Sequence, residues 1–278
     1  MGEFVSERVA PQVEVRRPKA ILGASPPFVS FAMPAYNEEK VIEKTIVECQ
    51  EALKSSGLAV YPSSGEVRWG EIVVTDDCSK DSTPIILARL QETMPNLVVV
   101  THLDKNQGYG RTLWDAIAAT RGEWVATLDS DGQFDPADLV KFLELVRKAG
   151  GEIDCIAGYR EKKRDTLVRV IADRGLNLLV KAMFGIRHRD TNCAFKLVRG
   201  EIIRNLIIES RSFQTPTEIV LKLHAMGYKM MEVGVSHRGR GEGKSKLKVV
   251  KTSLDFFRFL LYLRTKINLY KKGILMRL

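Results

Sequence analysis

The sequence contains no long uncharged apolar run. A membrane-spanning helix needs about 18 such residues, and no stretch of this chain provides them. The first residues also lack the apolar core of a signal peptide, because they are interrupted by Glu3, Glu7, Arg8, Arg16 and Arg17. We therefore expect a protein that is soluble or that lies on a membrane surface.

Cysteine and histidine are few and scattered. The four cysteines form no CxxC motif, and the four histidines show no spacing typical of a metal site or a catalytic triad. This excludes a disulfide or zinc framework and predicts reduced, mostly buried thiols in a cytoplasmic protein. We assign no histidine a catalytic role. The residues concerned are Cys49, Cys78, Cys155, Cys193, His102, His188, His224 and His237.

The chain is basic, with a formal net charge of +9 over 278 residues. An anionic partner such as a nucleic acid, a sugar nucleotide, a phospholipid surface or a lipid phosphate fits this charge. The sequence shows no nucleic-acid-binding module and no aromatic residues interleaved on a basic surface, so we expect no nucleic-acid partner. A hydrophobic content of 45% allows one large α/β domain or two small ones.

Apolar runs and helical patterns alternate through the first half of the chain. Strands are predicted at 28–33, 71–75, 97–101, 123–128 and 153–158, with helices between them. This alternation predicts a mostly parallel, Rossmann-like α/β sheet with helices on both faces. Ligands of such sheets bind at the carboxyl ends of the strands.

The two ends of the chain differ from this pattern. Residues 1–27 are rich in proline and are expected to form an extended arm. A basic helix is predicted at 165–184 and an amphipathic helix at about 249–270. The terminal helix could pack on the domain, but its many large apolar residues slightly favour contact with an anionic membrane or a partner.

Two carboxylates follow the predicted strand at 123–128. Asp129 and Asp131 repel each other unless a cation or a proton lies between them, so they predict a Mg²⁺ or Mn²⁺ site facing a ligand phosphate. Gln133 can join them as a neutral ligand. The alternative is an ordinary solvated turn at the end of a strand.

Other strand ends carry candidates for nucleotide and phosphate binding. Asp76 and Asp77 suit a base or a ribose, although residues 79–83 are also good helix caps. Gly108 could allow close approach of a nucleotide or simply form a turn. Arg160, Arg169 and Arg174 could each bind a phosphate. The glycine-rich basic loop at 239–245, with Lys244 and Ser245, could be a phosphate-binding flap or a solvated linker.

The ordered set of motifs resembles the large inverting glycosyltransferase family with the GT-A fold. Within it, the chain is most similar to dolichyl- and polyprenyl-phosphate glycosyltransferases of the dolichol-phosphate mannose synthase type. The motifs are PAYNE at 34–38, DDCSKDST at 76–83, NQGYG at 106–110, DSDGQ at 129–133, DTNCAFK at 190–196 and GKSK at 243–246.

This resemblance implies a GT-A domain over 28–246, followed by an amphipathic helix over 247–278. The domain would bind a nucleotide sugar with 28–158 and the acceptor with 159–246. The donor would be GDP-mannose or UDP-glucose and the acceptor a polyprenyl or dolichyl phosphate, at the cytoplasmic face of a membrane. The implied donor-binding residues are Pro34, Tyr36, Glu38, Asp76, Asp77, Gly108, Arg111, Asp129, Lys244 and Ser245.

The resemblance also implies the reacting groups. Asp129, Asp131 and Gln133 would hold the metal on the donor diphosphate, while Arg160 and Arg169 would meet the acceptor phosphate. Four residues after Arg169 the chain has Asp173, where the mannose synthases often have serine. A phosphate acceptor is already ionised and needs no strong base, since its second pKa is about 6.

Two other functions stay open at this stage. The first is the same donor chemistry with a soluble sugar or phosphoglycerate as the acceptor. A hydroxyl acceptor needs a general base, for which Asp190 is the candidate, although it could equally be a turn residue. The second, more remote function is that of a non-catalytic basic protein that binds nucleic acid.

Overall fold

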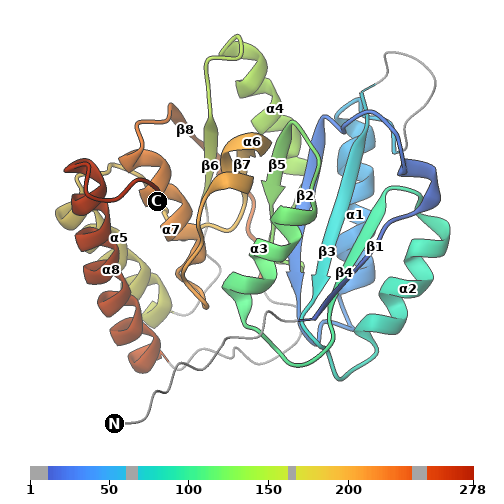
Figure 1. Ribbon diagram of the computed structural model, residues 1–278, viewed down its shortest axis with the longest axis horizontal. Helices are drawn as coiled ribbons and strands as arrows, with labels where there is room; N and C mark the ends of the chain where they lie inside the picture. Colours follow the sequence, from blue (N-terminus) through green and yellow to red (C-terminus); the bar gives the residue numbers. More distant parts are fainter. Residues whose placement is uncertain (1–11, 61–67, 162–166, 240–248) are drawn as a thin grey trace.

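The computed structural model describes residues 12–60, 68–161, 167–239 and 249–278, without the side chains of 167–174 and 249–253. In these ranges the chain forms one mixed sheet of eight strands in the order β1-β4-β3-β2-β5-β7-β6-β8 (Figure 1). The strands are β1 Val13–Arg16, β2 Val29–Ala35, β3 Gly70–Asp76, β4 Leu97–His102, β5 Trp124–Thr127, β6 Cys155–Arg160, β7 Lys196–Arg199 and β8 Met230–Val235.

Most of the sheet is parallel, as the sequence predicts. β2 pairs in parallel with β3 and β5, β3 with β4, and β6 with β8. β7 runs antiparallel to both β5 and β6, so these two strands point the same way. The carboxyl ends of β2, β3, β4, β5, β6 and β8 therefore meet at one edge of the sheet, and the predicted α/β fold is confirmed.

The N-terminal region contributes to the sheet. We expected an extended arm over 1–27, outside the domain. In the described part of that range, β1 pairs with the edge strand β4 in antiparallel register, with Val13 opposite His102. Residues 1–11 lie outside the described residues. Prolines flank this strand rather than interrupt it, so its backbone N–H groups can join the ladder.

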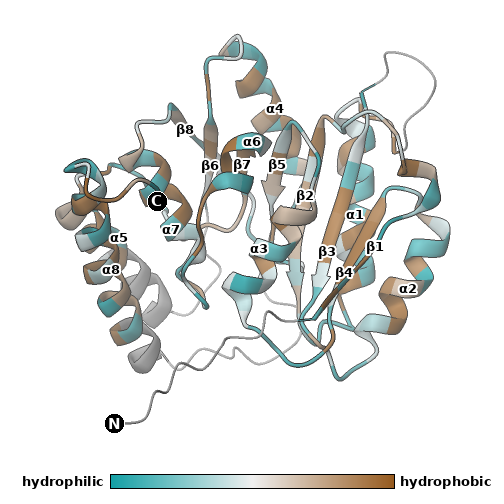
Figure 2. Cartoon of the chain, in the orientation of Figure 1, coloured by the Kyte–Doolittle hydropathy of each residue, from teal (hydrophilic) through white to brown (hydrophobic). Residues whose placement is uncertain are grey.

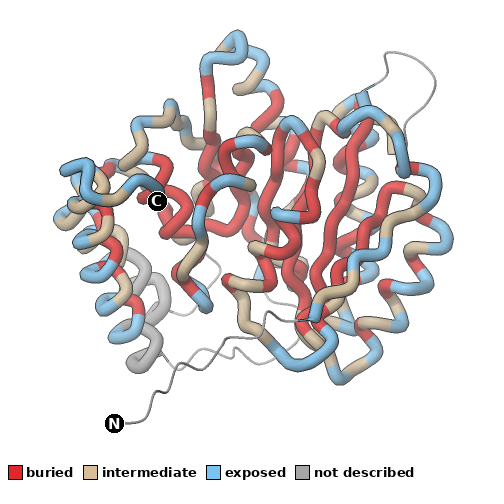
Figure 3. Tube along the Cα trace, viewed as in Figure 1, coloured by how far each residue is buried: buried red, intermediate tan, exposed pale blue. Residues whose placement is uncertain are grey.

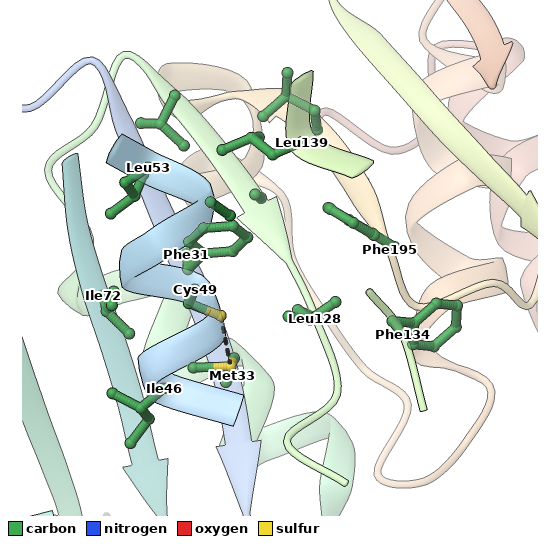
Figure 4. Packing of buried hydrophobic residues seen from close by; sticks show 14 of the residues in the cluster. Phe31, Met33, Ile46, Cys49, Leu53, Ile72, Leu128, Phe134, Leu139 and Phe195 are labelled. Atoms are coloured by element: carbon green, nitrogen blue, oxygen red, sulfur yellow. Dashed lines mark hydrogen bonds between the residues drawn. The ribbon is translucent and has the colours of Figure 1, made fainter. Parts of the chain in front are cut away.

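Helices cover both faces of the sheet. They are α1 Ile42–Ser55, α2 Thr83–Thr93, α3 Tyr109–Ala119, α4 Leu139–Lys148, α5 Leu167–Phe184, α6 Gly200–Asn205, α7 Thr215–Ala225 and α8 Val249–Lys271, with short 3₁₀ turns at Lys19–Ile21 and Pro136–Asp138. Side chains alternate across a strand. Phe31 and Met33 of β2 therefore pack under α1 with Ile46 and Cys49, whereas Ala32 faces the opposite layer (Figure 4).

The central strands are buried on both faces. Every residue of β2 and β3 is buried, and Figure 3 shows the same pattern across the middle of the sheet. A strand covered by helices on both sides needs apolar side chains in both directions, so its hydrophobic run is nearly continuous. This packing fixes the strand ends, and with them the loops that carry the polar motifs.

The terminal helix α8 packs against α5 and α7 at the end of the sheet farthest from β1 (Figure 1). Phe256, Leu260, Leu263 and Ile267 recur at helical spacing and are buried. Each such side chain stabilises the packing by about 1.5–3 kcal/mol. Packing on the domain therefore accounts for one side of this helix, which the sequence alone slightly disfavoured.

The other side of α8 remains exposed. Leu254, Phe257 and Leu261 are between 40% and 51% exposed. Apolar and polar residues alternate along the helix (Figure 2). Contact of this exposed side with a membrane or a partner stays a prediction. None of the helices in the described ranges combines the length and hydropathy needed to cross a bilayer.

Candidate active site

A pocket of about 470 Å³ opens at the carboxyl edge of the sheet. Its size is typical of a site for a ligand as large as a nucleotide. Residues from β2, from the loops after β3, β4, β5 and β8, and from β6 line it. The lining includes these residues predicted from the sequence: Pro34, Tyr36, Glu38, Asp77, Gly108, Asp129, Asp131, Gln133 and Arg160.

The turn after β5 presents the two carboxylates to this pocket. Ser130, between them, is buried, and its hydroxyl donates a 2.6 Å hydrogen bond to the carbonyl of Pro34. The carbonyl of Ser130 accepts a bond from the Thr45 hydroxyl. Because the middle residue is anchored inward, Asp129 and Asp131 lie on the pocket side.

The electrostatics of this turn favour a cation. Burial, together with the charge of Asp131, raises the pKa of Asp129 to about 7. The Tyr109 hydroxyl donates a 2.7 Å hydrogen bond to Asp129, and burial raises the pKa of this phenol well above its usual value. The described residues contain no cluster of three or more His, Cys, Asp or Glu side chains placed to hold a metal. A cation here would therefore draw further ligands from the substrate.

The loop that carries Asp76 and Asp77 divides their roles. Asp77 lines the pocket and accepts bonds from the amides of Gln107 and Gly108 at 2.7 and 3.0 Å. Asp76 is buried and does not line the pocket, and burial raises its pKa. Within the described residues its Oδ1 has no hydrogen-bond partner.

The turns after β2 and β3 hold each other. The Asn37 side chain accepts a bond from the Lys80 amide at 2.7 Å, and the Asn37 amide donates to the Ser79 hydroxyl. Asn37 has a positive φ of 54° and does not cap α1, whose N-cap is Val41. Asp81 accepts a bond from the Thr83 amide at the start of α2, which fits the capping role proposed for residues 79–83.

Arg160, which lines the pocket from the end of β6, forms a paired unit with Asp190. Arg160 Nε and Nη2 donate to the two carboxylate oxygens of Asp190 at 2.7 and 3.1 Å. The Asp190 side chain is only 2% exposed and does not line the pocket. Asp190 thus orients Arg160, and a carboxylate paired in this way is poorly placed to act as the general base considered above.

Other predicted residues lie elsewhere. Arg111 donates from Nε to Asp115 at 2.7 Å and does not line the pocket. Arg169 lies on α5, but its side chain is outside the described residues, as are Lys244 and Ser245.

Gly108 and Gly110 serve close packing. A Cβ at Gly108 would stand 2.7 Å from the carbonyl oxygen of Arg211, and one at Gly110 would stand 1.9 Å from that of Ser210. The segment at 210–213 therefore rests directly on the start of α3. Gly108 also has a φ of 87°, which side-chain-bearing residues rarely adopt.

The structure adds pocket residues that sequence reasoning missed. His237 follows β8 and packs edge-on against Phe134, with ring centroids 5.2 Å apart. Arg211 and Phe213 line the pocket from the segment before α7, and the Phe213 ring lies 5.6 Å from that of Tyr109. Arg211 makes no hydrogen bond or ion pair with the described part of the chain. The position of His237 at a strand end was the available signal.

Comparison with known proteins extends these observations. Residues 30–206 match the family described as Glycosyl transferase family 2. The undecaprenyl-phosphate 4-deoxy-4-formamido-L-arabinose transferase of Pseudomonas paraeruginosa is 28% identical over 80% of this chain and 61% of its own length. The dodecaprenyl-phosphate galacturonate synthase of Rhizobium johnstonii is 28% identical over 86% of this chain and 68% of its own length. The chain thus spans about three fifths to two thirds of these relatives.

Solved structures show the same fold. Glucosyl-3-phosphoglycerate synthase from Mycobacterium tuberculosis, in complex with phosphoglyceric acid, superposes with a TM-score of 0.64 at 19% identity and covers 88% of this chain and 82% of that one. The same enzyme in complex with Mn²⁺, UDP-glucose and phosphoglyceric acid gives a TM-score of 0.63. With the family match over residues 30–206, the chain belongs to glycosyltransferase family 2 and is a glycosyltransferase.

Proposed function

We propose that this glycosyltransferase moves a sugar from a nucleoside diphosphate to a polyprenyl phosphate at a membrane surface. The observation that carries the proposal is the composition of one pocket. It places two mutually repelling carboxylates, Asp129 and Asp131, together with two arginines, Arg160 and Arg211. A reaction between two phosphate-bearing substrates needs cationic groups for both.

The donor side fits a divalent cation bound with a diphosphate. Asp129 and Asp131 would hold Mg²⁺ or Mn²⁺, with Gln133 as a neutral neighbour. Burial and, after it, the charge of Asp131 raise the pKa of Asp129, and a bound cation would offset both effects. When bound, the cation neutralises charge on the departing diphosphate. A related fold binds Mn²⁺ in one solved structure, which supports this assignment.

The acceptor side fits a phosphate. Asp190 holds the guanidinium of Arg160 in a fixed orientation, and Arg211 brings a second guanidinium to the same pocket. A phosphate oxygen of the acceptor attacks the anomeric carbon, and the bond from that carbon to the diphosphate oxygen breaks. The nucleoside diphosphate leaves with the electron pair. No proton has to be removed, which suits a site where Asp190, the acid bonded to Arg160, is held by that guanidinium.

The sugar is the least specified part of the proposal. The sequence resemblance favours mannose or glucose. The names of the two curated relatives instead mention 4-deoxy-4-formamido-L-arabinose and galacturonate. We therefore propose a nucleotide-linked hexose, hexuronic acid or modified pentose, and the donor panel contains all four sugars.

Membrane contact is proposed for the exposed side of α8. Leu254, Phe257 and Leu261 lie beside Arg258, whose side chain is 70% exposed. A helix with apolar residues next to cations can lie in the interface of an anionic bilayer. Flotation with anionic liposomes should be weakened by replacing Phe257 and Leu261 with serine.

A matched control for flotation is Ile85→Ser. Ile85 is 73% exposed on α2, which is at the other end of the sheet (Figure 1). This substitution removes similar exposed apolar area and should leave liposome binding unchanged. Equal flotation of the wild type and the Phe257/Leu261 variant would contradict the proposed surface.

The function itself is tested by release of nucleoside diphosphate from a panel of donors. The panel contains GDP-mannose, UDP-glucose, UDP-galacturonate and the UDP-linked formamido-arabinose, each with Mg²⁺ or Mn²⁺. Each donor is offered undecaprenyl phosphate, dolichyl phosphate or 3-phosphoglycerate. We expect turnover that requires a lipid phosphate. Turnover with phosphoglycerate alone would favour a soluble acceptor, and no turnover with any pair would contradict the proposal.

A further inference from the structure

A buried histidine lies directly behind the donor side of the pocket. His102 ends β4 and is 1% exposed. Its Nδ1 is 2.6 Å from Oδ1 of Asp77, and its Nε2 is 2.8 Å from Oδ2 of Asp115 on α3. Both ring nitrogens are therefore used within the protein, and His102 does not line the pocket.

The two carboxylates define the charge of this ring. A neutral imidazole carries one N–H, so one of its nitrogens would face a carboxylate oxygen lone pair to lone pair. Only the imidazolium can donate in both directions. Burial opposes the charged form, but the hydrogen bonds that the ring donates to Asp115 and Asp77 outweigh burial and raise the pKa of His102 to about 9.

The surrounding charges are arranged as a chain. Arg111 donates from Nε to Oδ2 of Asp115 at 2.7 Å, so this oxygen is shared by a guanidinium and the imidazolium. On the other side, Asp77 accepts the amides of Gln107 and Gly108. The charged side chains that contact or adjoin the ring are thus Asp77 from the end of β3, and Asp115 and Arg111 from α3.

We propose that His102 is a positioning residue for the nucleotide. As an imidazolium it fixes the Asp77 carboxylate, and through Asp77 it fixes the Gln107–Gly108 amides at the wall of the pocket. Asp77 and Gly108 both line that wall, whereas His102 acts only through them. The inference rests on the proposed function, because it takes the ligand of this wall to be the nucleoside diphosphate.

A purely structural role predicts a different result. A buried ion cluster that only stabilises the fold would change the free energy of unfolding and leave the affinity of the folded protein for nucleotide unchanged. If His102 positions the nucleotide, replacing it changes nucleotide affinity and the dependence of that affinity on pH. The replacement should also raise the KM for the donor more than it lowers kcat, because Asp129 and Arg160 are on other strand ends.

The test is calorimetric binding of UDP and GDP, with Mn²⁺, to the wild type, His102→Gln and Asp115→Asn between pH 6.5 and 10. His224→Gln on α7 is the matched control, since this histidine does not line the pocket. We expect wild-type affinity to fall as the pH rises through about 9. His102→Gln should bind at least tenfold more weakly at pH 7 and lose that alkaline fall. Titration of the nucleobase itself occurs in every variant and cancels in the comparison.

Asp115→Asn keeps the histidine but removes one of its two anionic partners, so the alkaline fall should move to lower pH. This variant keeps the inference testable if His102→Gln does not fold. Equal affinity and an identical pH profile in His102→Gln and the wild type would overturn this inference alone. So would an unshifted profile in Asp115→Asn. Failure of the wild type to bind any nucleoside diphosphate would overturn both this inference and the proposed function.

Discussion

Breaking the ion pair between Arg160 and Asp190 by substitution should lower the free energy of unfolding, even without any substrate present. The Arg160 side chain is 11% exposed and the Asp190 side chain 2% exposed. They are joined through both carboxylate oxygens. Removing one member of a buried ion pair typically costs about 3–5 kcal/mol. Because domains of this kind are stable by about 5–15 kcal/mol, Arg160→Ala or Asp190→Ala alone should lose a large share of the total stability.

A double-mutant cycle isolates the interaction. Urea unfolding can be followed by the fluorescence of Trp69 and Trp124, which are both buried. The double variant Arg160→Ala/Asp190→Ala should be more stable than the sum of the single losses implies, by about 1–3 kcal/mol.

The exposed pair Arg16–Glu14 provides the control cycle. Its nitrogen–oxygen distance, 2.8 Å, is similar, but its side chains are 57% and 42% exposed. Exposed pairs couple by about 0–1 kcal/mol. Equal coupling energies in the two cycles would refute the view that burial makes Asp190 the fixed support of Arg160.

Three further predictions concern stability. Leu260→Ala should lower the free energy of unfolding by about 2–5 kcal/mol, because Leu260 is fully buried on the inner side of α8. Its neighbour Leu261, 47% exposed, should tolerate the same change within about 0.5 kcal/mol in the same urea titration. Gly110→Ala should lower the melting temperature, since its Cβ would meet the Ser210 carbonyl at 1.9 Å, whereas Gly175→Ala on α5 meets nothing within 4 Å and should not. An unaltered melting temperature in Gly110→Ala would contradict the close packing. Finally, the pKa of His102 rises on folding from 6.5 to about 9. Its contribution to stability is therefore complete below pH 6.5 and is lost as the pH rises through about 9. Unfolding titrations at pH 6.5 and 9.5 should show a larger loss in the wild type than in His102→Gln, and parallel losses would contradict the charged state.

Local sequence signals were sufficient for the sheet and for the carboxylates. The apolar run at 124–128 and the two acids after it can be recognised without knowledge of any distant residue. The two acids at 76–77 can likewise be recognised from the local sequence, because they follow the apolar run at 71–75. Parallel strands place their carboxyl ends at one edge, so the sequence also predicts that these turns lie close together. The structure brings them into one pocket.

Contacts between distant parts of the chain could not be predicted in this way. Arg160 and Asp190 are 30 residues apart, and nothing in either local pattern indicates that they pair. The link between Phe134 and His237 depends on an isolated bridge between loops far apart in the sequence. Arg211 precedes α7 in a segment with no recognisable motif. All three features nevertheless contribute residues to the lining of the pocket, namely Arg160, Phe134, His237 and Arg211.

The direction of the antiparallel strand β7 also could not be predicted from the local sequence. β7 spans Lys196–Arg199 and lies antiparallel between β5 and β6. A short apolar strand has the same local pattern in either direction, so the sequence predicts that it exists but not which way it runs. The expected arm contains β1 for a related reason, because an edge strand needs only one hydrogen-bonded neighbour and can be very short.

The most direct test of the account is the identity of the lipid product. Wild-type protein, Mn²⁺, the active nucleotide sugar and undecaprenyl phosphate are incubated together, and the organic extract is analysed by mass spectrometry. We predict a lipid with the mass of undecaprenyl phosphate plus one glycosyl group. This lipid should be absent with Asp131→Asn, while circular dichroism shows that the fold of the variant is retained. A wild-type extract without this lipid, or a full yield from Asp131→Asn, would contradict the account.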